Sequence, residues 1–345
     1  MSDPNCTPQL ADSHGRVMDY LRLAVTDRCN FRCVYCLPDG ADESEPHTLS
    51  LAQIERILRV LGSMGVRKVK ITGGEPLVHP EIVDIVRLAK NSPNIVNVTL
   101  TTNGLLLDKL APGLIAAGLD AVNISLDTLD PARFHYLTRR DYLPRVLAGL
   151  DLVLAAGDLA VKVNCVPTAD SPMADLLALA GLAKDRRLHV RYIELMPIGL
   201  GQGLKGLDPQ ELTRALVATY GPLTPVSRQL GNGPATYFAL PGFVGRVGFI
   251  SAVQSRFCDR CNRLRVTADG FFKTCLHMDR GLQLPLADEA AMVETIRRAV
   301  RLKPASHLFN QDPQTPQDSP APQAPRADQS ADPLPENRLM SRIGG

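Results

Sequence analysis

Six of the eight cysteines in this chain fall into two triplets, and their spacing indicates metal chemistry. The first triplet, Cys29, Cys33 and Cys36, has the spacing C-x3-C-x2-C. Three thiolates can hold three irons of a [4Fe–4S] cube, which normally takes four cysteine ligands. The fourth iron then stays open to a substrate or cofactor. A zinc site or free thiols are the alternative, but zinc usually takes four ligands, and no fourth lies nearby in sequence.

The second triplet, Cys258, Cys261 and Cys275, has the spacing C-x2-C-x13-C. It fits either a zinc ribbon with His277 as the fourth ligand or a second [4Fe–4S] cluster with an open iron. Two arginines follow Cys261 at strand-like spacing, so both should point to one side of the backbone. Arginine forks suit phosphate oxygens, and these two are Arg263 and Arg265. Cys6 and Cys165 are interpreted as structurally incidental.

The elements that position the first triplet are alternating apolar runs and amphipathic stretches. Strands are predicted at 21–26, 66–72, 96–102, 121–127, 160–166 and 189–195, and helices near 50–64, 80–91, 105–117, 142–156 and 172–186. Ser50, with Gln53 three residues later, predicts a capping box at the start of the first helix. Six β/α units predict a parallel sheet. Six units are too few for a closed eight-fold barrel, so the predicted fold is an α/β, partial (β/α)6 TIM-type barrel.

Polar residues occur where these strands end, which is the edge that carries the chemistry of barrel-type sheets. The first strand ends at the cysteine loop, and the second ends in Thr72-Gly73-Gly74-Glu75-Pro76. A Gly-Gly pair alone more often marks a turn, although its exposed carbonyls and a carboxylate can also receive an ammonium group. Similar positions in later strands are Thr101, Ser125 and Met196. Their shared placement predicts one site.

Basic residues lie inside several apolar strand runs, at Arg22, Lys70, Lys162 and Arg191. A lysine in a covered strand is costly unless an anion pairs with it. A solvated edge strand is the alternative for Lys162. Taken together, these residues predict an interior cavity that receives a multiply charged anion.

Bulk composition bounds the protein class. The chain has 345 residues, 45% of them hydrophobic, and a net charge of +2, which argues against a general nucleic-acid or membrane binder. No run of about 18 apolar residues and no apolar signal region is present, so a cytoplasmic protein is expected. The sequence lacks a G-x4-G-K-[ST] phosphate loop.

Five parts of the chain are predicted. They are a flexible N-terminus (1–19), the partial barrel (20–197), a smaller C-terminal α+β domain with the second triplet (198–303), a disordered Pro/Gln-rich linker (304–339) and a Gly-Gly tail (340–345). Residues 198–206 are glycine-rich and are interpreted as a loop, and 236–284 as short strands and hairpins.

The first triplet and Gly73-Gly74-Glu75-Pro76 resemble the radical S-adenosylmethionine (SAM) superfamily. In that superfamily SAM chelates the open iron, and the reduced cluster cleaves SAM to a 5′-deoxyadenosyl radical. The resemblance implies SAM contacts from Tyr35, Gly74, Ser125 and Met196. Without the resemblance, Met196 would be interpreted as an ordinary core methionine.

The second triplet, the Arg-x-Arg that follows and the Gly344-Gly345 end make the chain resemble the GTP 3′,8-cyclase family, also called the molybdenum cofactor biosynthesis protein A family. The resemblance runs from about residue 20 to about residue 303 and resumes at the last six residues. It implies a lyase that forms (8S)-3′,8-cyclo-7,8-dihydroguanosine 5′-triphosphate, the first step of molybdenum cofactor biosynthesis. A hydrogen atom leaves C3′ of GTP, and the C3′ radical attacks C8 of the guanine.

The same resemblance implies the cofactors, contacts and partners. The cofactors are SAM and two [4Fe–4S] clusters, with the guanine on the open iron of the second. The tail glycines Gly344 and Gly345 reach into the site. Expected partners are a flavodoxin- or ferredoxin-like electron donor and cyclic pyranopterin monophosphate synthase, and the expected state is a monomer or homodimer. The implied GTP contacts are Arg22, Lys70, Thr101, Lys162, Arg191, Arg263 and Arg265.

Two departures and two alternatives accompany this resemblance. The linker looks longer than the family's usual connection, and His79 stands where the family has an arginine, with no expected effect on the clusters. A radical SAM peptide-modifying enzyme with an auxiliary cluster remains an alternative, although such enzymes often carry more C-terminal cysteines. A zinc-stabilised binding module is the other alternative, and it predicts zinc without iron.

Overall fold

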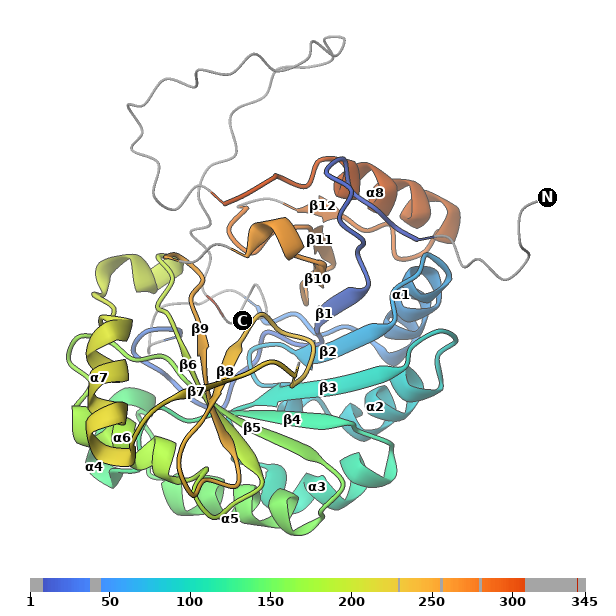
Figure 1. Cartoon of the computed structure of the whole chain (residues 1–345). Coiled ribbons are helices and arrows are strands. Elements are labelled where there is room, and N and C mark those ends of the chain that lie inside the picture. Colours follow the sequence, from blue (N-terminus) through green and yellow to red (C-terminus); the bar gives the residue numbers. More distant parts are fainter. Residues whose placement is uncertain are drawn as a thin grey trace, which may run out of the picture.

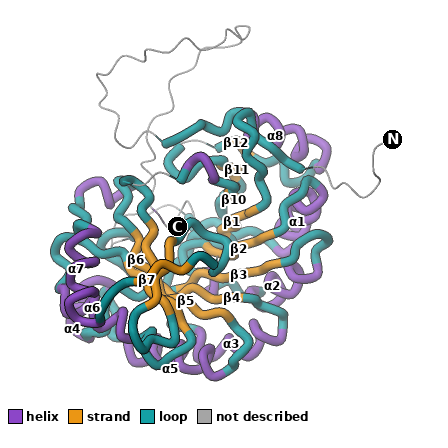
Figure 2. The backbone as a smooth tube through the Cα atoms, viewed as in Figure 1, coloured by secondary structure: helices purple, strands orange, loops and turns teal. Residues whose placement is uncertain are grey.

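The fold is one twelve-stranded sheet, wrapped on its outer side by helices (Figures 1 and 2). The computed structural model describes residues 9–37, 45–228, 230–254, 257–278, 281–307 and 340. The strand order is β12-β11-β10-β1-β2-β3-β4-β5-β6-β9-β8-β7. The strands are β1 (Tyr20–Ala24), β2 (Lys68–Thr72), β3 (Asn97–Thr102), β4 (Ala121–Ser125), β5 (Ala160–Cys165), β6 (Leu188–Ile193), β7 (Thr224–Val226), β8 (Thr236–Ala239), β9 (Arg246–Ile250), β10 (Arg263–Val266), β11 (Phe271–Lys273) and β12 (Leu282–Gln283).

The partial barrel predicted from the sequence is confirmed, because β1 to β6 pair in parallel in chain order. The capping box is also present: the Gln53 amide donates to Ser50 Oγ, and the Ser50 amide donates to Gln53 Oε1 at 2.8 Å. The helices are α1 (Leu51–Ser63), α2 (Ile82–Asn91), α3 (Leu107–Ala116), α4 (Pro131–Thr138), α5 (Leu143–Ala155), α6 (Met173–Gly181), α7 (Pro209–Tyr220) and α8 (Glu289–Arg301), with short 3-10 turns η1 (Pro76–Val78), η2 (Gly199–Gly203) and η3 (Cys258–Arg260). Of these helices, α4 was not predicted from the sequence.

The C-terminal strands extend both ends of the barrel sheet, which the sequence did not predict. Strand β9 pairs in parallel with β6, and β10 pairs in parallel with β1. In this register Arg265 lies beside Arg22, and Arg263 lies beside Tyr20. The second cysteine triplet is therefore attached to a strand that hydrogen-bonds directly to the strand preceding the first triplet.

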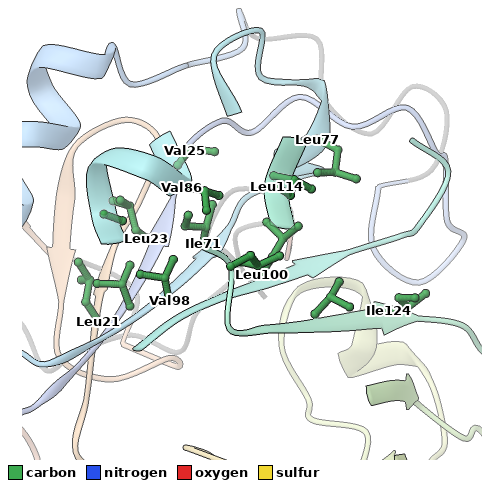
Figure 3. Close-up of a cluster of buried hydrophobic side chains, with 14 of the residues drawn as sticks. Leu21, Leu23, Val25, Ile71, Leu77, Val86, Val98, Leu100, Leu114 and Ile124 are labelled. Carbon is green, nitrogen blue, oxygen red and sulfur yellow. The ribbon is translucent and has the colours of Figure 1, made fainter. Parts of the chain in front are cut away.

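Strand alternation separates the apolar core from the barrel interior. Leu21, Leu23 and Ile71 are fully buried on the outer face of the sheet, where they pack with residues such as Val86 of α2 (Figure 3). The alternate residues of the same strands face inward. Their register places Arg22 beside Lys70, Asn123 beside Lys162, and Asn164 beside Arg191.

Candidate active site

A cavity of about 660 Å³ occupies the barrel interior, and both cysteine triplets line it. Every predicted site residue within the described part of the chain lines this one cavity. Gly344 and Gly345 lie outside the described residues, but Met340 of the same tail lines the cavity. Residues that are far apart in the sequence therefore line the same cavity.

The loop after β1 presents the first triplet from a hydrogen-bonded backbone. The Cys36 amide donates to the Cys33 carbonyl at 3.0 Å, and the Arg32 guanidinium donates to the Cys29 carbonyl at 2.7 Å. The Val34 amide donates to Leu137 O of α4 at 3.0 Å, so the unpredicted helix supports this loop. Burial, and next the nearby Glu75, raises the pKa of the Cys29 thiol to about 11. Iron must displace such protons when it binds, so cluster assembly releases protons.

The three thiols of the first triplet line the cavity together, and thiolates are the ligands of iron–sulfur clusters. Within the described ranges, no three His, Cys, Asp or Glu side chains converge on one ion position. A zinc ion needs its ligands in one coordination sphere, whereas three cysteines of a cube each hold a different iron. The donor set therefore suits a [4Fe–4S] cluster with an open iron.

Gly74 and Glu75 join the end of β2 to the cysteine loop and to β3. A Cβ at position 74 would lie 2.4 Å from the Arg28 carbonyl oxygen, so only glycine fits there. The Glu75 carboxylate accepts hydrogen bonds from Thr102 Oγ1 at 2.7 Å and from the amides of Asn103 and Leu77. Burial raises its pKa to about 7. This carboxylate therefore ties two strand ends together, in addition to facing the cavity.

Tyr35 is held in place by a residue that the sequence analysis did not select. Its hydroxyl donates to Asp127 Oδ2 at 2.5 Å, and the Val166 amide donates to the other Asp127 oxygen at 2.9 Å. In the sequence, only the position of Asp127 just after β4 indicated that it could belong to the site. Ser125 and Met196 are both partly open to the cavity, so Met196 is not an ordinary core methionine.

Basic residues of the strands line the cavity in the barrel interior. Lys162 is 7% exposed and lies on β5, between β4 and β6, so the edge-strand alternative is wrong. Arg191 donates to Asn164 and Asn123 at 2.8 Å, and Lys70 donates to Thr101 Oγ1 at 3.4 Å. No carboxylate within the described segments forms an ion pair with Lys70, Lys162 or Arg191.

Burial and mutual repulsion disfavour the charge on these groups. Burial, and next the Arg191 charge, lowers the pKa of Lys162 to about 8. Burial and three neighbouring cations hold the pKa of Lys70 well below its ordinary value. Burial lowers the pKa of Arg22 to about 10. A polyanion in the cavity would relieve this repulsion, which is the behaviour of an anion site.

The second triplet lies among cations at the other side of the cavity. Burial opposes ionisation of Cys261, but Arg263 and Lys303 act against it, and the pKa of this thiol is lowered. The Arg263 guanidinium stacks over the Phe257 ring at 4.6 Å. His277, the fourth ligand in the zinc alternative, lies close to the triplet, with its Nε2 3.2 Å from Cys275 Sγ. No third metal-binding side chain of the described residues joins this pair around one ion position.

The partial parallel barrel, with a C-x3-C-x2-C loop after its first strand, defines a radical SAM protein. The family model described as Radical SAM superfamily matches residues 23–182, and the model described as Molybdenum Cofactor Synthesis C matches residues 188–309. Proteins named GTP 3′,8-cyclase from Moorella thermoacetica and Pelotomaculum thermopropionicum are each 42% identical, over 86% of this chain and 95% of their own length. A third, from Petrotoga mobilis, is 39% identical over 87% of this chain and 95% of its own length. The chain therefore belongs to the GTP 3′,8-cyclase family.

Solved structures support the fold alone. Streptococcus suis SuiB bound to S-adenosylmethionine matches with a TM-score of 0.61 and 16% identity, over 84% of this chain and 69% of that one. SuiB bound to its precursor peptide SuiA matches with the same TM-score and 15% identity, over 87% of this chain and 74% of that one. In the described part of this chain, no helix is long and apolar enough to cross a membrane.

Proposed function

We propose that this protein is a GTP 3′,8-cyclase, which converts GTP to (8S)-3′,8-cyclo-7,8-dihydroguanosine 5′-triphosphate at the start of molybdenum cofactor biosynthesis. One observation carries the proposal: two cysteine triplets and several basic residues of the barrel strands line the same cavity. Buried cations in the barrel suit a triphosphate, and the curated relatives are named GTP 3′,8-cyclase.

Each triplet would hold one cluster. Cys29, Cys33 and Cys36 would hold the cluster that binds SAM, near Tyr35 and Gly74. Cys258, Cys261 and Cys275 would hold the cluster that binds the guanine. When bound and reduced, the first cluster and SAM supply the radical chemistry that removes the C3′ hydrogen atom.

The chain's own residues would hold the nucleotide between these two groups. The triphosphate fits the inward-facing cations Arg22, Lys70, Lys162 and Arg191. Burial, and next the charges of neighbouring cations, lowers the pKa values of Lys70 and Lys162. Arg263 and Arg265 lie beside the second triplet and would orient the base end. Fixing both ends of GTP brings C8 and C3′ together, and such positioning can supply much of the rate enhancement.

The C-terminal tail is included in the proposal. Met340 lines the cavity, four residues before Gly344. This position supports a tail that reaches the nucleotide, as in the resembling family. A flavodoxin- or ferredoxin-like donor and cyclic pyranopterin monophosphate synthase are the proposed partners.

Isotope transfer under strict anaerobiosis tests the proposal. The protein is reconstituted with iron and sulfide and given SAM, a strong reductant and GTP deuterated at C3′. The 5′-deoxyadenosine should gain one deuterium. Deoxyadenosine without deuterium would exclude C3′ of GTP as the abstraction site and favour the peptide-modifying alternative. A protein that holds zinc and forms no deoxyadenosine would favour a binding module.

A further inference from the structure

Lys303 is a buried cation that the site described above does not yet use. It lies just after α8, and only 2% of it is exposed. In the described part of the chain, no carboxylate lies within ion-pair distance of its ammonium group. A buried ammonium needs other partners, because its desolvation is costly.

Those partners all belong to the second cysteine triplet or its flanks. Lys303 Nζ donates to the Thr274 carbonyl, to the Arg263 carbonyl at 3.1 Å, and to Cys261 Sγ at 3.7 Å. An ammonium group has three donors, so the two carbonyls and the sulfur use all of them. The two carbonyls hold the charge in place beside the ligand sulfur.

The segment that carries Lys303 is itself fastened to the triplet. The Arg16 guanidinium donates to the Cys258 carbonyl at 2.6 Å, to the Pro304 carbonyl at 2.6 Å and to the Ala305 carbonyl at 2.9 Å. Asp12 accepts from Arg16 Nε at 2.6 Å and completes this clamp. Arg16 therefore holds the same two loops as Lys303, but it reaches carbonyl oxygens and no sulfur.

We propose that Lys303 is a positioning residue for the second cluster, which donates a hydrogen bond to the Cys261 sulfur and raises the reduction potential of that cluster. Net charge and hydrogen bonds to the sulfurs set the potentials of iron–sulfur clusters. A fixed positive charge beside a ligand sulfur stabilises the reduced, more negative form. The inference rests on the second cluster of the proposed function, but it does not depend on GTP as the substrate.

A redox titration followed by electron paramagnetic resonance tests the inference. In the full chain, Cys29, Cys33 and Cys36 are replaced by alanine, so that the second triplet holds the only cluster. Lys303→Met in this background should lower the reduced-to-oxidised ratio about tenfold at a fixed potential, which corresponds to about 59 mV for a one-electron couple. Lys303→Arg keeps the charge and should shift the ratio less.

Arg16→Gln is the matched control, because it loosens the same loops without removing a donor from sulfur. It should lower the iron content or the unfolding temperature, while the remaining cluster titrates as in the parent. A parent-like potential in Lys303→Met, or an equal shift in Arg16→Gln, would overturn the proposal.

Two further outcomes separate this inference from the proposed function. If Lys303→Met does not retain iron, the reduction potentials of Lys303→Gln and Lys303→Arg are compared instead. Equal iron loss in all three variants would mean that Lys303 only holds the loops together, and it would overturn the proposed effect on the potential. A parent that forms no cluster would overturn both the second cluster and this inference. A normal cluster without deuterium transfer from GTP would overturn only the substrate.

Discussion

At the scale of single residues, the interior of the barrel combines buried cations with a buried carboxylate, and both have shifted pKa values. Lys162 is 7% exposed with a pKa of about 8, and Glu75 is 1% exposed with a pKa of about 7. In both cases burial is the main cause. The protein thus carries groups whose protonation changes near neutral pH and whose effects can be measured separately.

The first prediction concerns Lys162 and the pH dependence of GTP binding. A triphosphate favours the charged ammonium, so above pH 8 each GTP that binds must be accompanied by a proton. The Kd for GTP should rise by up to about tenfold for each pH unit above 8. Calorimetric titrations of the reconstituted protein between pH 7 and 9.5 measure this slope.

Lys162→Met should weaken binding and reduce the slope, and the slope that remains comes from Lys70, whose pKa is also lowered. Lys109→Met, on the exposed side of α3, should leave both unchanged. An equal slope in Lys162→Met and in the unchanged protein would contradict the assignment of the titrating group.

The second prediction concerns Glu75 and stability. Its folded pKa of about 7 lies above the ordinary 4.5, so the folded state binds this proton more tightly than the unfolded state does. The contribution of Glu75 to stability is therefore largest at low pH and is lost as the pH rises through 7. Between pH 6 and 8 the stability difference between the unchanged protein and Glu75→Gln should fall by about 1 kcal/mol. Thermal unfolding under argon measures it, with Glu81→Gln, at an exposed position, as the control. A difference that is constant with pH would refute the linkage.

At the scale of elements, the sequence predicted the six β/α units because each has a clear apolar period. It also predicted which residues face the cavity, since strand alternation and strand ends fix their direction. It missed α4, whose eight residues carry a weak apolar pattern, and the pairing of β10 with β1, because four-residue strands show no period. The contacts of Asp127 and of Lys303 were also missed. Their partners lie far away in sequence, so only the folded chain brings them together.

The third prediction concerns the loop between β7 and β8, which closes over Lys162. Gly231 has φ of +122°, and a Cβ there would lie 3.3 Å from Lys162 Nζ. Asn232 Nδ2 donates to Asn97 Oδ1 at 2.5 Å and ties the loop to β3. Gly231→Ala should introduce strain of about 1–3 kcal/mol and move the loop.

The expected result of Gly231→Ala is a KM for GTP about tenfold higher, with an unchanged KM for SAM. Gly233→Ala is the matched control, since a Cβ at that position meets nothing within 4 Å. Equal effects of the two substitutions would mean that the strain at Gly231 has no role in binding.

At the scale of the whole molecule, the two cysteine triplets share one sheet. Strands β1 and β10 hydrogen-bond along their length, from Tyr20 beside Arg263 to Leu23 beside Val266. The C-terminal part of the chain therefore extends the barrel sheet on both sides, through β9 and β10.

The fourth prediction concerns the link between this body and the tail. Residues 311–332 lie outside the described part of the chain and are Pro- and Gln-rich in sequence. Deleting them should leave turnover intact or raise it, because a shorter tether raises the effective concentration of the tail at the cavity. Removal of Gly344 and Gly345 is the comparison and should lower turnover. A large loss of turnover in the 311–332 deletion would refute this prediction, and steady-state rates under argon decide it.

The pairing of β1 with β10 also sets the order in which parts of the barrel can fold during synthesis. The ribosome makes Tyr20 more than 240 residues before its partner Arg263. Until then β1 has β2 on one side and an open edge on the other, and such edges invite pairing with other chains. Contacts between residues so distant in sequence form slowly. Folding of this side of the barrel, and with it the site for the second cluster, therefore waits until β10 has been synthesised.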